Sequence, residues 1–382
     1  MVNELRKRRL SAGVFFFLAG FCFSSWASRI PDFQREFSLS EGQLGSLLLG
    51  MPLGSLLALP LAAWAVFRFG SKVVVLIGMA FYIVALILIG LSTSVFILAV
   101  MVFVFGMLGN VMNISLNTQA VHIEKDYKRN ILSSFHGLWS LAGFFGAGLG
   151  ALMVYIGISP GIHYFLVMIM GLGIIIFAKS GLVKEASGKE SAGGGLFFKR
   201  PGGVILKLGM VGFCGMMCEG CLFDWSGVYM ATVALAPPHL VPAGYVAYMG
   251  AMAMGRFIAD KLANKWGKVP VIQTSGAMIF LGLIAAVIWP SFWVVIIGFL
   301  LVGFGTASVV PLTYSMAGLS KDYAPGIAIA MVSTISFFGF LLGPPIIGFV
   351  AELLDLRSSF ALMSIVGLMV SVWVTIGKKS FK

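Results

Sequence analysis

The chain has 382 residues, of which 59% are hydrophobic and only 10% are charged, and its mean hydropathy is +1.01. Because soluble domains carry about 25% charged residues, this composition excludes a protein that has water as its main solvent. We interpret the formal net charge of +12 as a property of the loops, not as a sign of nucleic-acid binding.

Apolar runs follow one another along the chain, separated by short polar breaks. Each is about 20 residues long, the length of a helix that crosses the hydrocarbon core of a membrane. In the first half, the predicted spans are 10–30, 44–66, 73–91, 95–118, 131–156 and 161–178. In the second half, they are 204–230, 243–263, 270–289, 293–316, 327–350 and 358–377.

The first apolar run follows a basic stretch, residues 6–9, and so resembles a signal peptide. Its spanning length and the spans that follow predict a retained helix instead. Placing the N-terminus inside puts nearly all Lys and Arg on the inner side, which fits the positive-inside rule. We therefore expect a multi-pass protein of the bacterial inner membrane with both termini in the cytoplasm.

The longest polar break inside the chain, residues 179–203, is rich in Gly, Ser and Lys and indicates a flexible linker. It divides the spans six and six. The sequence thus predicts an N-terminal six-helix bundle at 1–178, a cytoplasmic linker at 179–203 and a C-terminal six-helix bundle at 204–382.

A weak internal repeat relates the two halves. The stretch Arg68-Phe-Gly70 matches Lys265-Trp-Gly267 at an offset of 197, and residues 125–127 match 321–323 at an offset of 196. Because each half has an even number of spans, the halves enter the membrane in the same orientation. We expect an all-α membrane protein with twelve transmembrane helices, in two bundles related by a pseudo-two-fold axis along the membrane normal.

Together the six-plus-six spans, the basic central segment and the repeated turn resemble the major facilitator superfamily. The signature of this family, Gly-x-Leu-Ala-Asp-Arg-x-Gly-Arg-Arg, is matched in part at 63–72 and at 264–268, although Phe67 and Asn264 replace its Asp. The resemblance covers the whole chain and implies secondary transport of a small solute by alternating access. Within the family, residues 134–139 and 219–226 are similar to a bacterial subgroup related to fucose and hexose permeases.

Ionisable side chains inside a membrane span are costly and point to function. Glu219 and Asp224 lie in the seventh predicted span, and we expect one of them to carry a proton. The alternative is a pair of acids neutralised by a partner or facing a water-filled vestibule. Arg29, at the end of the first span, either pairs with Asp224 in one state or extends to lipid headgroups.

Five residues are predicted to take part in gating. Arg256 and Asp260 lie four apart on one helix face and predict an ion pair that opens during transport, with a static clamp as the alternative. Arg68, Gly70 and Gly267 belong to the repeated turns, where the resemblance implies a gating role.

The fourth span carries amides with helical spacing. Asn110, Asn113 and Asn117 recur at i, i+3 and i+7, which places them on one face. Amides both donate and accept hydrogen bonds, so this face suits a hydroxyl-rich solute; the alternative is hydrogen bonding between helices. The repeat adds Thr306 in the tenth span, close to Tyr314.

Aromatic and imidazole side chains extend this predicted solute site. His136 and Trp139 share a face of the fifth span, and in the permeases that the chain resembles, aromatic rings pack against sugars. Trp26 and Trp225 are further candidates. The alternatives are a structural hydrogen bond for His136 and an interfacial belt for the two tryptophans.

Glycines and prolines in the fifth and eleventh spans predict close helix packing and a bend or break near Pro344. The four cysteines include Cys214, Cys218 and Cys221 at helical spacing, which we interpret as small apolar fillers and not as a metal site. No nucleotide-binding loop or catalytic set is found in the sequence, so we expect no enzyme, no metal and no cofactor.

We therefore predict a proton-coupled secondary carrier of a small polar solute, with a sugar as one candidate. Its expected partners are the solute, protons and membrane lipids, without nucleic acid, and we expect the monomer to be functional. Two alternatives stay open: a proton-driven exporter of amphipathic compounds, and a membrane receptor on the same scaffold that does not transport.

Overall fold

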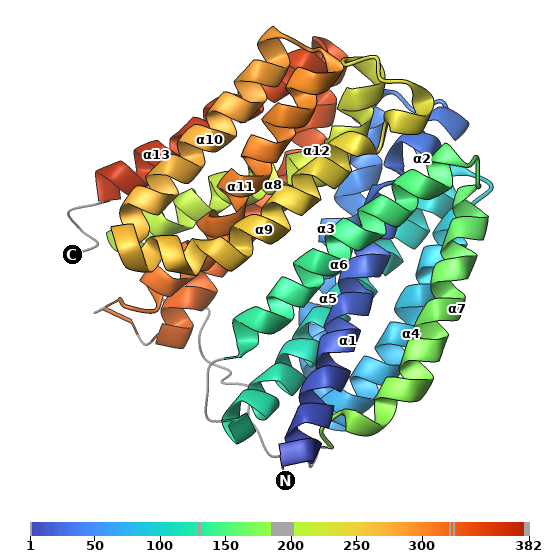
Figure 1. The fold of residues 1–382 in the computed structure, drawn as a ribbon, viewed down its shortest axis with the longest axis vertical. Coiled ribbons are helices and arrows are strands. Elements are labelled where there is room, and N and C mark those ends of the chain that lie inside the picture. The colour runs from blue at the N-terminus through green and yellow to red at the C-terminus, as the bar shows by residue number, and fades with distance from the viewer. Residues whose placement is uncertain (1, 128–130, 185–201, 321, 324, 378–382) are drawn as a thin grey trace. The chain divides into compact units, whose positions relative to one another are not determined.

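The computed structural model describes residues 2–127, 131–184, 202–320, 322–323 and 325–377, and the ribbon over these ranges is built from helices and turns (Figure 1). The first half contains α1 (Val2–Ala27), α2 (Ile30–Glu36), α3 (Glu41–Phe69), α4 (Ser71–Gly90), α5 (Val95–Tyr127), α6 (Leu132–Tyr155), α7 (Pro160–Ala178) and the 3₁₀ turn η1 (Lys179–Gly181). The second half contains α8 (Gly203–Thr232), η2 (Pro238–Leu240), α9 (Ala243–Trp266), α10 (Lys268–Ile288), α11 (Phe292–Ala317), α12 (Pro325–Leu353) and α13 (Leu356–Gly377).

Each predicted span lies mainly on one of the long helices, so the all-α prediction is confirmed. Most ends differ by one to three residues, and two of the differences bear on the site. The predicted first span ran to residue 30, but α1 ends at Ala27 and the short helix α2 follows. The fourth span was predicted to end at 118, whereas α5 continues to Tyr127, because a helix need not stop where its apolar stretch stops.

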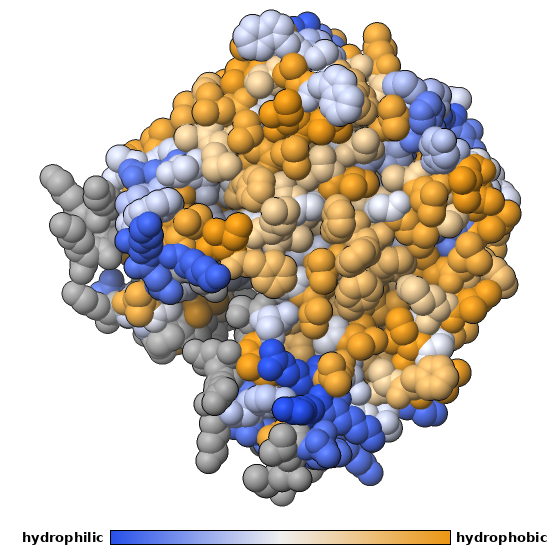
Figure 2. Space-filling model, in the orientation of Figure 1, coloured by the Kyte–Doolittle hydropathy of each residue, from blue (hydrophilic) through white to orange (hydrophobic). Residues whose placement is uncertain are grey.

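Eleven helical segments of the described chain are long and apolar enough to cross a membrane. The eighth predicted span, α9, is a helix but is not among them. Its second half carries four charged residues, Arg256, Asp260, Lys261 and Lys265. Apolar side chains spread over the flank of α7 in Figure 2, where Ile162, Phe165 and Phe177 are exposed. Such a surface is suited to lipid contact.

The described chain divides into two compact units. Unit 1 comprises residues 1–32 and 50–194, and unit 2 comprises residues 33–49 and 195–382. The helix α3 thus contributes its first turns to unit 2 and the remainder to unit 1. The boundaries proposed above, 1–178, 179–203 and 204–382, stay a prediction, and residues 185–201 lie outside the described ranges.

Within unit 1, glycines let α1 and α6 pack closely, as the glycines of the fifth span predicted. A Cβ atom on Gly20 would lie 2.4 Å from the carbonyl oxygen of Trp139, and one on Gly146 would lie 2.9 Å from that of Phe21. The hydroxyl of Ser24 donates to the carbonyl of Gly143 at 2.6 Å. The two backbones therefore approach more closely than larger residues would allow.

This packing predicts different outcomes for two glycines of α6. Gly146→Val is expected to lower the thermal stability of the purified protein, because overpacking costs about 1–3 kcal/mol. Gly148→Val is the matched control, since a Cβ atom there meets nothing within 4 Å. Equal stability of the two variants in thermal unfolding would contradict the close contact between α1 and α6.

Unit 2 repeats this arrangement between α8 and α12. A Cβ atom on Gly339 would lie 2.1 Å from the carbonyl oxygen of Phe213. Of the predicted bend or break near Pro344, the break is wrong, because α12 continues from Pro325 to Leu353 through both prolines; the bend stays a prediction. The helix α12 approaches α3 closely here, since the carbonyl oxygen of Pro344 would lie 2.9 Å from an ideal Cβ on Gly45 of α3.

The repeated turn has the same backbone conformation in both halves. Gly70 has φ 78° and ψ 150°, and Gly267 has φ 87° and ψ 156°. Residues with a Cβ atom rarely adopt this positive φ, so both positions favour glycine. Each glycine separates two long helices, α3 from α4 and α9 from α10, which supports the offset of 197 found in the sequence.

Candidate functional site

A buried ion pair joins two helices of unit 2. The Oε1 atom of Glu219 in α8 lies 3.2 Å from an Nη atom of Arg256 in α9, and the two side chains are 10% and 21% exposed. A charge removed from water is costly unless it is paired. The pair therefore offsets part of the cost of removing these two charges from water.

Two tyrosine hydroxyls lie in the same region of unit 2 as this ion pair. The fully buried Tyr248 shares a hydrogen bond of 3.3 Å with Thr306 of α11. The hydroxyl of Tyr314 donates to Ser333 of α12 at 3.2 Å. Both tyrosines lie within electrostatic range of Glu219. Four helices, α8, α9, α11 and α12, therefore bring a carboxylate, a guanidinium and phenolic hydroxyls together.

Asp224 lies further along α8 and is 7% exposed. No hydrogen bond or ion pair of its carboxylate is found within the described residues. Trp225 beside it is fully buried, and its indole nitrogen has no hydrogen-bond partner in the described part of the chain. Trp26 of α1 is 1% exposed. The alternative of an interfacial belt is therefore wrong for both tryptophans.

A chain of polar side chains lies in unit 1. The amide of Asn117 donates to the side-chain and main-chain oxygens of Asn113 one turn earlier in α5, at 2.5 and 2.8 Å. A ring nitrogen of His136 in α6 lies 3.2 Å from the Oδ1 atom of Asn117. Asn113 and His136 are exposed, so polar atoms at both ends of this row of hydrogen-bonded side chains are accessible.

Aromatic rings from α1 flank this polar chain. The ring of Phe16 contacts His136 edge to face at a centroid distance of 5.7 Å. Phe23 lies at the same distance from Trp139. Aromatic side chains combined with a few polar groups are common in sites for small molecules.

Asn110 differs from the other two amides of α5. Its side chain donates a short hydrogen bond to the carbonyl of Ser55 in α3. This contact corresponds to the alternative of hydrogen bonding between helices, and a role of Asn110 in solute binding stays a prediction. Helical spacing placed the three amides on one face, but α3 covers only one end of that face.

Arg29 lies in the turn between α1 and α2 and is 3% exposed, so it does not extend to lipid headgroups. Its Nε atom lies 2.7 Å from the carboxylate of Asp32, and an Nη atom donates to the carbonyl of Ile158 at 2.6 Å. These partners were not predicted. A pairing of Arg29 with Asp224 in another state stays a prediction.

The predicted gating residues lie at separate places. Arg68 is exposed at the end of α3, and Gly70 and Gly267 form the repeated turns. Arg256 pairs with Glu219, a partner that the spacing within α9 did not indicate. The side chain of Asp260 lies outside the described residues, so the predicted pair of Arg256 with Asp260 stays a prediction.

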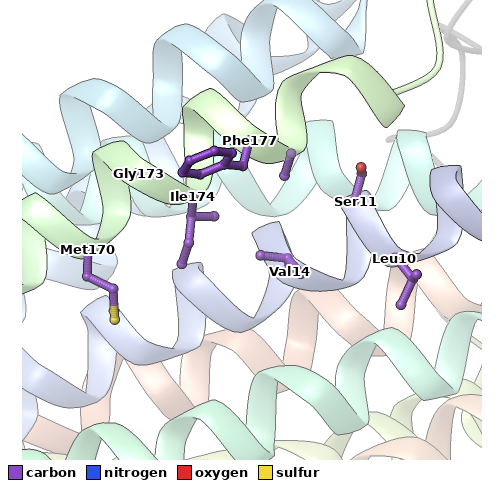
Figure 3. A pocket seen from close by; sticks show the side chains of 8 residues that line it. Leu10, Ser11, Val14, Met170, Gly173, Ile174 and Phe177 are labelled. Carbon is purple, nitrogen blue, oxygen red and sulfur yellow. The ribbon is translucent and has the colours of Figure 1, made fainter.

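One open groove lies between α1 and α7 and has a volume of about 480 Å³ (Figure 3). Its lining is apolar apart from Ser11, with Val14 and Phe177 among the residues that face it. It offers too few polar groups to orient a polar solute. In the described part of the chain, no group of three or more His, Cys, Asp or Glu residues is placed to hold a metal ion.

Comparisons with known proteins agree with this architecture. The family model described as Major Facilitator Superfamily matches residues 12–318 and 236–380. The chain is 31% identical over 364 residues to an uncharacterized MFS-type transporter of Yersinia pestis, covering 95% of this chain and 94% of that protein. It is 30% identical over 373 residues to an uncharacterized transporter of Sinorhizobium fredii, covering 97% and 98%.

Two solved structures have the same fold. The nucleoside transporter NupG superposes with a TM-score of 0.76 at 12% identity, covering 97% of this chain and 99% of that one. A bacterial homologue of the human lysosomal transporter Spinster gives 0.76 at 14% identity, covering 99% and 98%. At such low identity these likenesses establish the fold alone.

Proposed function

This chain belongs to the Major Facilitator Superfamily and is a transporter of that type; from this premise we propose that it is a proton-coupled secondary carrier of a small polar solute. It works by alternating access in the bacterial inner membrane, with both termini in the cytoplasm. Solute, protons and surrounding lipids are its partners, and a single chain holds a complete pathway.

The buried pair of Glu219 and Arg256 is the observation that carries the proton coupling. Protonation of Glu219 removes its negative charge and releases Arg256, so a single proton changes the contact between α8 and α9. Deprotonation restores the pair. Such a two-state contact is what links proton binding to a conformational change. Asp224 is the second candidate for a proton on the same helix.

The polar chain of unit 1 supports a solute with hydroxyl groups. Asn113, Asn117 and His136 offer donors and acceptors, and Trp139 offers an aromatic face. In unit 2, Thr306 and Tyr314 add hydroxyls near Glu219. Sugars of the fucose and hexose type fit this chemistry, as the resemblance to that permease subgroup implies, and nucleosides combine the same hydroxyls with an aromatic base.

Ligand-dependent thermal stability tests the proposal. The purified protein is heated with sugars, nucleosides, amino acids and amphipathic cations, at acid and at neutral pH. A solute present at 100 times its dissociation constant stabilises the folded state by about 2.7 kcal/mol. We expect one polar solute to raise the unfolding temperature, and we expect Asn117→Ala to remove that rise.

Thr118→Ala is the matched control, because the Thr118 hydroxyl donates to the Ile114 carbonyl of its own helix. The rise should persist in this variant. A response to amphipathic cations alone would favour the exporter. The absence of any response at either pH would favour the receptor.

A further inference from the structure

A second group of buried ionisable side chains lies in unit 1. The chain turns sharply after α1, and this turn places Arg29 and Asp32 against the start of α7. Arg29 joins the turn to the segment before α7 by donating a hydrogen bond to the carbonyl of Ile158, two residues before α7 begins. His163 and Tyr164, in the first turns of α7, lie within electrostatic range of Arg29.

His163 is completely buried, and neither of its ring nitrogens has a hydrogen-bond partner within the described residues. The hydroxyl of Tyr164 is likewise buried without a partner there. A neutral imidazole has one donor and one acceptor, and leaving such a group buried without partners is destabilising. Packing alone gives no reason to keep a histidine at this position.

Close packing leaves no room for a larger ligand beside His163. An ideal Cβ atom on Gly150 of α6 would lie 2.0 Å from the hydroxyl of Ser28 and 3.7 Å from the imidazole of His163. On the α4 side, Gly90 lies against Tyr164. The charged group that acts on His163 is Arg29, and the ring of Tyr164 lies 5.2 Å from the imidazole, centroid to centroid. A proton is the ligand that such a space admits.

We propose that His163 is a proton-binding site of unit 1, at which a bound proton lies beside the positive charge of Arg29. A proton on His163 would place a second positive charge beside Arg29, and both side chains are buried. Proton binding therefore favours a conformation in which the turn between α1 and α2 moves away and water or Asp32 reaches the imidazole. This inference goes beyond the proposed function, which places the coupled proton on α8.

Cysteine accessibility tests the site without knowledge of the solute. Ser28 precedes Arg29 in the chain and is 4% exposed, and the native Cys22, Cys214, Cys218 and Cys221 are all buried. Ser28→Cys is labelled with a membrane-impermeant maleimide at about pH 8 and about pH 5.5, on either side of the usual histidine range. The rate is divided by that of Thr93→Cys, which is exposed in the turn after α4.

We expect the ratio of the labelling rate of Ser28→Cys to that of Thr93→Cys to rise several-fold on acidification. When His163→Gln is added, the ratio should stay at its alkaline value. His122→Gln, on α5, is the matched control and should leave the rise intact. A ratio that does not change with pH, or a rise that persists in His163→Gln, would overturn the site. Both double variants should elute as folded protein, so that a lost response is not lost structure.

Glu219→Gln separates this inference from the proposed function. The pH-dependent labelling of Ser28→Cys should persist in that variant, because His163 lies in the other unit. If Glu219→Gln abolished the response and His163→Gln did not, His163 would be excluded and Glu219 would stay the proton site.

Discussion

Glu219→Gln is expected to abolish accumulation of solute against its gradient and to leave solute exchange intact. The amide keeps the size of the side chain and still accepts a hydrogen bond from Arg256, but it cannot take up or release a proton. Conformational cycling with solute on both sides therefore continues, while the link between proton and solute is lost. The observation behind this expectation is the contact of 3.2 Å with Arg256.

The measurement uses proteoliposomes and the solute that gives the largest thermal shift. Uptake driven by an imposed pH gradient should fall to the level of protein-free liposomes, whereas counterflow into preloaded vesicles should continue. Glu36→Gln, at the exposed end of α2, is the matched control and should retain driven uptake. Driven uptake by Glu219→Gln at the rate of the unaltered protein would remove Glu219 from the coupling step and leave Asp224 as the candidate.

Arg256→Met is expected to destabilise the protein strongly, because it leaves the carboxylate of Glu219 buried without its partner. Removing one member of a buried ion pair costs about 3–5 kcal/mol. The unfolding temperature of the purified protein should therefore fall well below that of Lys261→Met, a matched change at an exposed position of α9. Both are measured at one heating rate, because unfolding of membrane proteins is often irreversible.

The double variant Glu219→Gln, Arg256→Met distinguishes a lost pair from a lost packing contact. With the carboxylate replaced, no unpaired charge stays buried, so most of the stability should return. The non-additivity of the two changes measures the interaction of the two residues. Additive losses would show that Arg256 stabilises the unit through its aliphatic stem and not through Glu219.

The positions of the long helices could be predicted from the sequence because a membrane imposes a simple rule. Backbone polar groups in hydrocarbon must be hydrogen-bonded within the segment, so an apolar run of spanning length has to be a helix. The repeat offset likewise predicted equivalent turns, and Gly70 and Gly267 share one backbone conformation. These features depend on local chemistry, which residue order expresses directly.

The pairing of charged residues could not be predicted in this way. Helical spacing indicated Asp260 as a partner of Arg256, and it gave no sign of the ion pair with Glu219, 37 residues away. Arg29 likewise forms an ion pair with Asp32. The two residues lie on either side of the start of α2, and the hydropathy pattern did not show that α1 ends before it. Periodicity tells which residues share a face, but not which helix lies opposite that face.

His163 illustrates the same limit for a single residue. In the sequence it is a histidine near the start of an apolar run, with no neighbouring charge to mark it. Tertiary packing alone brings it to Arg29 and buries both ring nitrogens. Hydropathy and spacing thus determined the spans, their helical form and the repeat, because lipid and backbone chemistry act locally. Only the tertiary structure decided which buried charges meet, because that depends on helices from distant parts of the chain packing together.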